Sequence, residues 1–209
     1  MKVTLIVGSP RKHRSCNFLI ENTIKGIKSV SEEIEISKLQ ISDYNITPCN
    51  GCDNCLREPY TCPLSESEID DLKKIEQELF SSDAVLIASP SYFGSVSAYL
   101  KLMIDRSRPW KMNNYSLSDK FFAPLIAQGT RNDAAGGVIY DLINFAIIQG
   151  MIVVGALGNP VLEQNIPVTS LQKYGRKEFL RKDEVDELGA KISENLGIRV
   201  ANLIMKSKK

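Results

Sequence analysis

The chain has 209 residues, of which 43% are hydrophobic and 24% are charged, and its 26 basic residues nearly balance 25 acidic ones. This length favours one domain with room for an elaboration. The balanced composition argues against disorder, a nucleic-acid surface and a polybasic membrane anchor. Because His13 is the one histidine, sites built on several histidines and catalysis relayed through a buried histidine are nearly excluded.

The N-terminus and the lengths of the apolar runs predict a cytoplasmic protein that does not associate with membranes. The apolar stretch before Gly8-Ser9-Pro10 is too short for a signal peptide. No other run approaches the roughly 18 uninterrupted apolar residues that a transmembrane helix needs. We therefore expect a reducing environment, in which thiols stay free.

Strand-like and helix-like segments alternate along the first half of the chain. Short apolar runs at 2–7 and 84–89 predict buried strands, and the alternating pattern of 33–39 predicts an edge strand. Apolar residues at helical spacing predict a helix over 17–28, with Ser15 as its candidate cap. Ser65 and Glu68 have the spacing of a capping box, which predicts a helix from there to about Phe80.

The second half continues the alternation. Its patterns predict helices over 96–105, 134–149 and 184–205 and strands over 121–127 and 151–157, whereas 159 to about 181 lacks periodicity. Buried strands that alternate with helices indicate a parallel sheet covered on both faces. Because no repeat or low-complexity linker interrupts the pattern, we expect one domain over 1–209 with a C-terminal extension from about residue 160.

The loop after the first predicted strand has features of an anion site. It reads Gly8-Ser9-Pro10-Arg11-Lys12-His13-Arg14-Ser15-Cys16-Asn17 and lacks the glycine patterns of dinucleotide folds and of nucleoside triphosphate hydrolases. It offers two hydroxyls, an arginine and the backbone N–H groups of a helix start, which suit a phosphate dianion held without a metal. The alternative for this loop alone is an ordinary capped turn with solvated basic side chains.

The loop after the third predicted strand places two aromatic residues on the same rim of the sheet. Tyr92 and Phe93 stand beside Gly94 within the run from Ser89 to Ser97. A flavin ring needs a flat apolar wall and backbone donors, and this segment offers both. Packing of the two aromatics in the core is the alternative, which their place in a loop rich in Pro, Gly and Ser disfavours.

Four of the five cysteines fall within 14 residues, in the pattern C-x2-C-x2-C-x6-C followed by Pro63. Three thiolates at the x2-x2 spacing can converge on one face of an iron-sulfur cubane, with a fourth from farther along. Since Cys16 alone lies outside this window, one four-iron cluster is the simplest solution. Structural zinc and free or redox-paired thiols are the alternatives. The four candidate ligands are Cys49, Cys52, Cys55 and Cys62.

Three motifs in this order resemble the iron-sulfur flavoproteins, a branch of the NADPH-dependent FMN reductase-like group. They are Gly8-Ser9-Pro10-Arg11, the run Pro48 to Cys55, and Ser89 to Ser97 followed by Lys101 and Asp105-Arg106. The resemblance covers about residues 1 to 160. It implies a flavodoxin-like three-layer α/β/α sandwich with a parallel five-stranded sheet of order 2-1-3-4-5. A cysteine-rich loop, residues 48–64, would follow the second strand.

The resemblance also implies two cofactors, FMN and a 4Fe-4S cluster held by the four clustered cysteines. Cys16 departs from the residue expected in the phosphate loop, so its contact would be through its backbone N–H. The loop 128–131 would approach the flavin from the fourth strand. By the resemblance, the FMN phosphate would be held by Ser9, Arg11, Ser15, Cys16 and Asn17, and the ring would be bordered by Pro90, Tyr92, Phe93, Gly94 and Ser95.

The function implied is that of an oxidoreductase that takes electrons from ferredoxin or a similar donor and passes them to a small acceptor, as a homodimer or dimer of dimers. One alternative is NAD(P)H-dependent reduction of FMN or quinones without a functional cluster. Another is a non-enzymatic electron carrier or a zinc-stapled binding module. A basic stretch is a candidate docking surface for an acidic ferredoxin, with a solvated face as its alternative. It comprises Lys173, Arg176, Lys177, Arg181 and Lys182.

Overall fold

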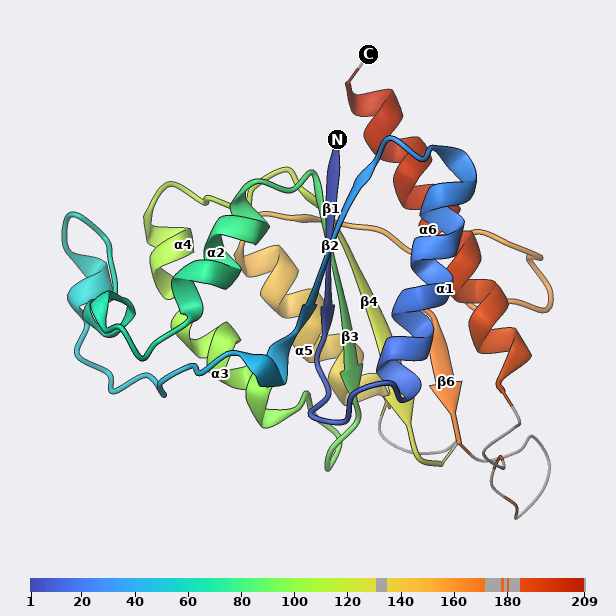
Figure 1. The fold of residues 1–209 in the computed structure, drawn as a ribbon, viewed down its shortest axis with the longest axis horizontal. Helices are drawn as coiled ribbons and strands as arrows, with labels where there is room; N and C mark the ends of the chain where they lie inside the picture. The colour runs from blue at the N-terminus through green and yellow to red at the C-terminus, as the bar shows by residue number, and fades with distance from the viewer. Residues whose placement is uncertain (131–134, 172–177, 179, 181–184, 209) are drawn as a thin grey trace.

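A parallel β-sheet forms the middle layer of the computed structural model, in which residues 1–130, 135–171, 178, 180 and 185–208 are described (Figure 1). Its strands run in the order β2-β1-β3-β4-β5, and β6 also pairs with β4. This order is the predicted one, so the flavodoxin-like fold class is confirmed. The described strands are β1 (Lys2–Val7), β2 (Glu35–Gln40), β3 (Ala84–Pro90), β4 (Phe121–Gln128), β5 (Ile152–Val153) and β6 (Val168–Ser170).

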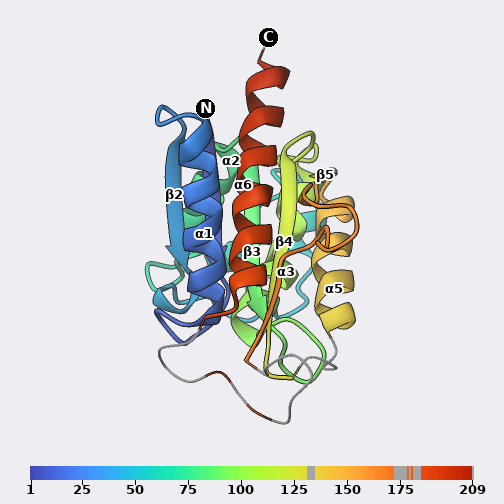
Figure 2. The same ribbon diagram turned by 90° about the vertical axis from the view of Figure 1, so that its right-hand side faces the viewer.

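Helices cover both faces of the sheet (Figures 1 and 2). Side chains alternate along β1, so that Val3, Leu5 and Val7 pack toward one helical layer and Ile6 toward the other. The expected C-terminal extension ends in a helix that lies beside α1 and completes the first layer. That layer contains α1 (Ser15–Val30) and α6 (Glu187–Ser207), and the other contains α2 (Leu72–Phe80), α3 (Ala98–Arg106), α4 (Arg108–Met112) and α5 (Ala135–Ile148).

Two short strands share the fifth position of the sheet, so the predicted strand over 151–157 is wrong in length. β5 pairs with the first two residues of β4, and β6 pairs with its last three. Between them the chain leaves the sheet, because the Ala156 N–H donates to the carbonyl of Asn165 rather than to β4. β6 was not predicted, because its three residues are too few to show an alternating pattern.

The predicted start of α2 is also wrong. Residues Pro63–Glu66 form a 3-10 turn, and α2 begins only at Leu72. The Ser65 hydroxyl accepts a hydrogen bond from Nη2 of Arg106 at 2.8 Å, so it does not cap a helix. Its partner comes from a distant element, which local capping patterns do not reveal.

Two other helix starts differ by one or two residues. Ser15 is the first residue of α1 rather than its cap, and the side chain of Arg14 before it makes no capping hydrogen bond. The helix expected from Val96 begins at Ala98, because the Ser97 hydroxyl accepts from the Leu100 N–H at 3.3 Å. Helix α3 therefore begins directly after the loop with the two aromatics.

None of the helices formed by the described residues is both long and apolar enough to cross a membrane. The longest of these, α6, is amphipathic. It buries Ile192, Leu196 and Val200 in the core and exposes Lys191 and Asn202 on its outer side. Its apolar face is therefore used in the core of the sandwich.

Candidate functional site

The loops that leave β1, β3 and β4 line a cavity of about 180 Å³ at one edge of the sheet, which we call the rim cavity. Ligands of open parallel sheets bind at this edge, beyond the carboxyl ends of the strands. Of the predicted flavin residues, the structure brings six to the cavity, while Asn17, Phe93, Gly94 and Ser95 do not line it. The lining residues are Ser9, Arg11, Arg14, Ser15, Cys16, Pro90, Ser91, Tyr92, Ala127, Gln128, Gly129 and Leu171.

The N-terminus of α1 forms the polar end of the rim cavity. Arg11 and Arg14 are exposed cations at its edge, and the Arg11 N–H donates to the Ser9 hydroxyl at 3.1 Å. The first turn of α1 carries no acidic side chain, and the side chain of the preceding Arg14 makes no capping hydrogen bond. A helix N-terminus with two nearby cations favours a dianionic group such as a phosphate.

Cys16 lies in the first turn of α1 and is 2% exposed. Burial raises the pKa of its thiol to about 12, although the Arg11 cation acts in the opposite direction. The thiol therefore stays protonated near neutral pH in the metal-free protein. Its chemistry separates it from the clustered cysteines.

A tight turn forms the loop between β3 and α3. The backbones of Tyr92 and Ser95 exchange two hydrogen bonds, of 3.1 and 3.2 Å. The central residues, Phe93 and Gly94, have φ angles of 51° and 78°, as a type I′ turn requires. Tyr92 lines the rim cavity, whereas the Phe93 side chain is fully exposed at the tip of the turn. The two aromatics therefore do not form one wall within this chain.

Helix α5 holds this turn in place. One carboxylate oxygen of Asp141 accepts from the Ser95 hydroxyl at 2.6 Å and from the Val96 N–H at 3.2 Å. A Cβ atom on Gly137 would lie 1.9 Å from the Gly94 carbonyl oxygen, so the approach of α5 requires glycine there. The sequence analysis missed both supporting residues, because nothing local marks a contact across more than 40 residues of chain.

Ser91 is a further lining residue that the sequence analysis missed. Its hydroxyl is buried at the rim cavity and has no hydrogen-bond partner among the described residues. Buried polar groups nearly always have partners, so an unpaired hydroxyl at a cavity marks a place for a polar ligand group. The α1 N-terminus at one end and Tyr92 beside it are groups of the kinds that bind a phosphate and an aromatic ring.

The cysteine loop, residues 48–64, projects away from the sheet beside α2 and α4 (Figure 1). Its cysteines are free thiols, of which Cys49 and Cys52 are exposed and Cys55 and Cys62 half-buried. Burial raises the pKa of the Cys55 thiol, Arg108 lowers it, and the nearby Cys62 and Cys49 raise it further. Three of the four sulfurs therefore share one neighbourhood.

The thiols of the cysteine loop are not gathered into a coordinating group in this structure. Within the described part of the chain, no three His, Cys, Asp or Glu side chains are arranged to hold a metal ion. The donor set of four thiols on one loop nevertheless has the chemistry that an all-thiolate iron-sulfur cluster requires. None of the four lines the rim cavity.

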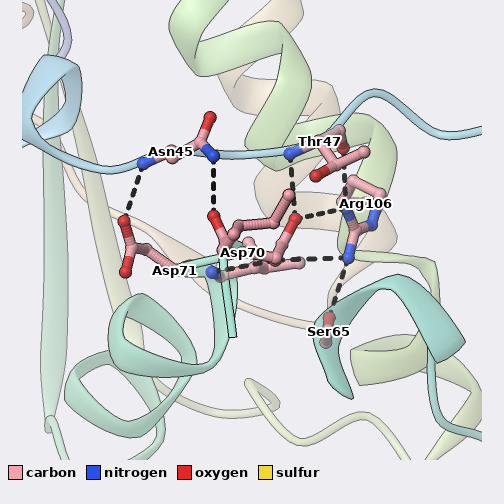
Figure 3. A network of polar contacts seen from close by, with 8 residues as sticks. Asn45, Thr47, Ser65, Asp70, Asp71 and Arg106 are labelled. Atoms are coloured by element: carbon pink, nitrogen blue, oxygen red, sulfur yellow. Dashed lines mark hydrogen bonds and ion pairs between the residues drawn. The ribbon is translucent and has the colours of Figure 1, made fainter. Parts of the chain in front are cut away.

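The corner between α3 and α4 contacts the cysteine loop through two arginines. Arg106 is buried and pairs with Asp70 at 2.9 Å (Figure 3). The exposed Arg108 pairs with Asp53 of the loop at 2.6 Å. Asp105 pairs instead with Lys101 on the surface of α3. Asp105 and Arg106 thus form ion pairs with other residues and not with one another.

His13 and the basic stretch of the sequence are two further candidate functional groups. His13 is exposed in the loop before α1 and does not line the rim cavity. The basic stretch from Lys173 to Lys182 falls mostly on residues outside the described part of the chain, as does Arg131 of the loop after β4. Ferredoxin docking on that stretch therefore stays a prediction.

Comparisons with known proteins identify the family of this chain. Residues 1–159 match the family described as NADPH-dependent FMN reductase. The chain is 36% identical over 201 residues to an iron-sulfur flavoprotein of Archaeoglobus fulgidus, covering 96% of each protein. It is 32% identical over 209 residues to an iron-sulfur flavoprotein of Methanocaldococcus jannaschii, covering 100% of each.

Solved structures support the same fold. FerB, an NAD(P)H:(acceptor) oxidoreductase of Paracoccus denitrificans, superimposes with a TM-score of 0.62 at 21% identity, covering 98% of this chain and 97% of its own. A WrbA-like flavodoxin of Agrobacterium tumefaciens gives a TM-score of 0.60 at 16% identity and 98% coverage of both chains. The family match, the two relatives and the rim cavity lead to one conclusion: this chain belongs to the NADPH-dependent FMN reductase family, in its iron-sulfur flavoprotein branch, and is a flavin-dependent oxidoreductase.

Proposed function

We propose that this oxidoreductase passes electrons from ferredoxin or a similar donor, through a 4Fe-4S cluster on the cysteine loop and FMN in the rim cavity, to a small acceptor. The observation that carries the proposal is that α3 joins the two sites. At its start, the Ser97 hydroxyl donates to the Gly8 carbonyl of the phosphate loop at 2.5 Å. At its end, Arg106 contacts both stems of the cysteine loop. Nine helical residues span roughly 13 Å.

Residues of the rim cavity would bind FMN in two groups. Ser9, Arg11 and Ser15, with the backbone N–H groups of Cys16 and Asn17, would hold the phosphate, and Ser91 would supply a further donor. Pro90, Tyr92 and the turn Phe93-Gly94-Ser95 would border the ring. When bound, FMN supplies a centre for one or two electrons and the cluster supplies a one-electron centre.

A homodimer or dimer of dimers completes the proposal. Because no loop cysteine lines the rim cavity, we infer that cluster and flavin approach one another across a subunit interface. Exposed apolar side chains support this association: Phe93 at the tip of the turn after β3 is fully exposed, and Tyr140, Ile147 and Ile148, which lie along α5, are 68%, 62% and 53% exposed. Contiguous exposed apolar surface marks association sites.

Anaerobic purification and reconstitution test the cluster directly. We expect about four iron and four sulfide per chain, together with bound FMN and broad visible absorption beyond the flavin bands. Chains with the four loop cysteines replaced by serine should keep FMN and lose the iron. A flavin-only spectrum with stoichiometric zinc would overturn the cluster proposal.

A second candidate function is direct reduction of FMN or quinones by NADPH, which the match to the NADPH-dependent FMN reductase family favours. Stopped-flow mixing of the oxidised protein with NADPH, and separately with reduced ferredoxin, separates the two. Rapid flavin reduction by NADPH that persists in the variant without loop cysteines would support the second candidate. Reduction by ferredoxin that disappears in this variant would support the first.

A further inference from the structure

Arg106 and Asp70 form an ion pair that is completely shielded from solvent. Both side chains are 0% exposed, and the Nη1 to Oδ2 distance is 2.9 Å. Removing two charges from water costs about as much as their attraction returns, so a buried pair is a poor source of stability by itself. The role of this ion pair is therefore to be found in the backbone segments that it holds in place.

The pair joins the two stems of the cysteine loop (Figure 3). Arg106 donates from Nη1 to the Thr47 carbonyl at 2.6 Å and from Nη2 to the Ser65 hydroxyl at 2.8 Å. Asp70 accepts from the Thr47 N–H at 2.9 Å. Thr47 lies two residues before Cys49, and Ser65 lies three residues after Cys62. We call these four residues, Arg106, Asp70, Thr47 and Ser65, the stem clamp.

A second set of contacts reinforces the stem clamp from the α2 side. The Asn45 N–H donates to Asp71 Oδ2 at 2.9 Å, and the Asn45 side-chain amide donates to the Ile69 carbonyl at 2.6 Å. The segment before the cysteines is therefore tied to the start of α2 at two successive points (Figure 3). The segment after them is tied to the same place through Ser65.

Arg106 suits this role for a chemical reason. Its planar guanidinium presents several N–H donors in a fixed geometry, so it contacts a carbonyl, a hydroxyl and a carboxylate at the same time. Closing a loop costs chain entropy, and this cost grows with the length of the loop. Because the stem contacts form when the protein folds, the chain entropy of closing the loop is lost at that step and not when a metal binds.

From this geometry we infer that Arg106 is a positioning residue for the cluster: with Asp70 and Ser65 it closes the stems so that four thiols stay within reach of one cluster. The inference rests on the cluster of the proposed function. It predicts that loosening the clamp weakens iron retention while the rim cavity keeps FMN, since no residue of the stem clamp lines that cavity.

Ser65→Ala and Ser107→Ala form the decisive pair of variants. Each removes one buried, hydrogen-bonded hydroxyl at the same corner, but Ser107 contacts the Ile104 carbonyl and Gln149 instead of the loop. After anaerobic reconstitution, iron loss to a ferrous chelator is followed with time. We expect Ser65→Ala to lose iron severalfold faster than the wild type, and Ser107→Ala to match the wild type.

Arg106→Lys supplies the larger change, because lysine keeps the charge beside Asp70 but cannot span the three partners. We expect iron loss about tenfold faster or more, at the level typical for residues that orient metal ligands. The electron paramagnetic resonance spectrum of the reduced cluster should broaden, and the FMN content should stay that of the wild type. In iron-free protein, hydrogen exchange should rise in residues 45–66 and not in β1 or β3.

Folded Ser65→Ala and Arg106→Lys proteins that retain iron and exchange hydrogen like the wild type would overturn this inference. Wild-type protein that takes up no iron under any reconstitution condition would instead refute the cluster itself, and the inference with it. Failure of the inference is therefore seen in the two variants, whereas failure of the cluster proposal is seen in the wild-type protein.

Discussion

The rim cavity and the cysteine loop lie at opposite ends of α3 and are built in different ways. The rim cavity is formed where buried strands end, and α1, α3 and α5 hold its loops through backbone contacts and the Asp141 carboxylate. The cysteine loop contains a short 3-10 turn, Asn54–Leu56, and the start of a second, Pro63–Glu66, and it exposes most of its side chains. The sheet thus shapes the flavin site in advance, whereas the thiol site depends on its stems and on its ligand.

The physical reason for the difference is burial. Segments that bury apolar side chains offset the entropy of ordering their backbone, and segments that do not must be ordered by cross-links, metals or polar contacts. Strand β3 is buried along its whole length, while most of the residues from Pro48 to Pro59 are exposed. The stem clamp is the polar contact that this loop has instead of a core.

The largest expected effect that tests this separation is the loss of the cluster without loss of flavin. Cys55→Ser should reduce iron and sulfide to well below one cluster per chain, because a four-iron cluster needs four protein ligands. FMN content should not change. Iron, sulfide and flavin analyses on one anaerobic preparation measure the cluster content and the FMN content. Cys16→Ser is the control variant, which should keep its iron. Joint loss of iron and flavin in Cys55→Ser would show that the sites are not independent.

Thiol alkylation should show the next largest effect. The pKa of Cys16 is about 12 against an ordinary 9.0, which lowers its thiolate fraction near neutral pH by about a thousandfold. In iron-free native protein, iodoacetamide should modify the four loop cysteines and leave Cys16 unmodified until denaturant is added. Peptide mass spectrometry with time assigns each site. Early modification of Cys16 would contradict its burial.

The stem clamp should make stability sensitive to acid. Burial raises the pKa of Asp70, but the Thr47 N–H, Arg106 and the Leu72 N–H together lower it below its ordinary value. A lowered pKa means that this carboxylate stabilises the fold above its unfolded-state pKa and loses that contribution as pH falls through the folded-state value.

Asp70→Asn tests this. It should lower the unfolding free energy of iron-free protein by about 3 kcal/mol near neutral pH, because it leaves the buried Arg106 without its counter-charge. Urea unfolding followed at several pH values should show the difference between wild type and variant shrinking in acid, below about pH 4. If the difference in unfolding free energy between wild type and variant stays constant with pH, the ionised Asp70 carboxylate does not stabilise the fold.

Two neighbouring glycines of α5 provide the smallest and most closely matched test. Gly137→Ala should weaken FMN binding by about tenfold, one factor of ten for each 1.4 kcal/mol lost, because its Cβ displaces the Gly94 carbonyl of the turn. Gly136→Ala has open space and should stabilise the helix by about 1 kcal/mol. Flavin titration and thermal unfolding measure both. Equal FMN affinity in the two variants would show that the contact between α5 and the turn after β3 does not affect FMN binding.

Local pattern was enough to predict the sandwich and the loops that face its rim. β1, β3 and β4 are buried almost throughout, so their apolar runs are unambiguous, and the order of strands that the family resemblance implied is confirmed. Residue type and spacing also predicted the two candidate sites, from four bunched thiols and an arginine-rich helix start, and these stay predictions. Boundaries were predicted less well, as the short β6 and the late start of α2 show.

What the chain pattern does not contain is the set of contacts between segments that are far apart in sequence. Ser65, expected to cap a helix, instead accepts a hydrogen bond from Arg106 in the stem clamp. Asp141 and Gly137 of α5 support a turn that lies more than 40 residues away in the sequence. The Phe93 side chain is exposed and does not line the rim cavity. Residue type and spacing determine which chemistry is available, because each side chain carries its own donors, charges and sulfurs. Packing decides which of these groups meet, because hydrogen bonds and ion pairs need partners within a few ångströms, and folding alone brings those partners together.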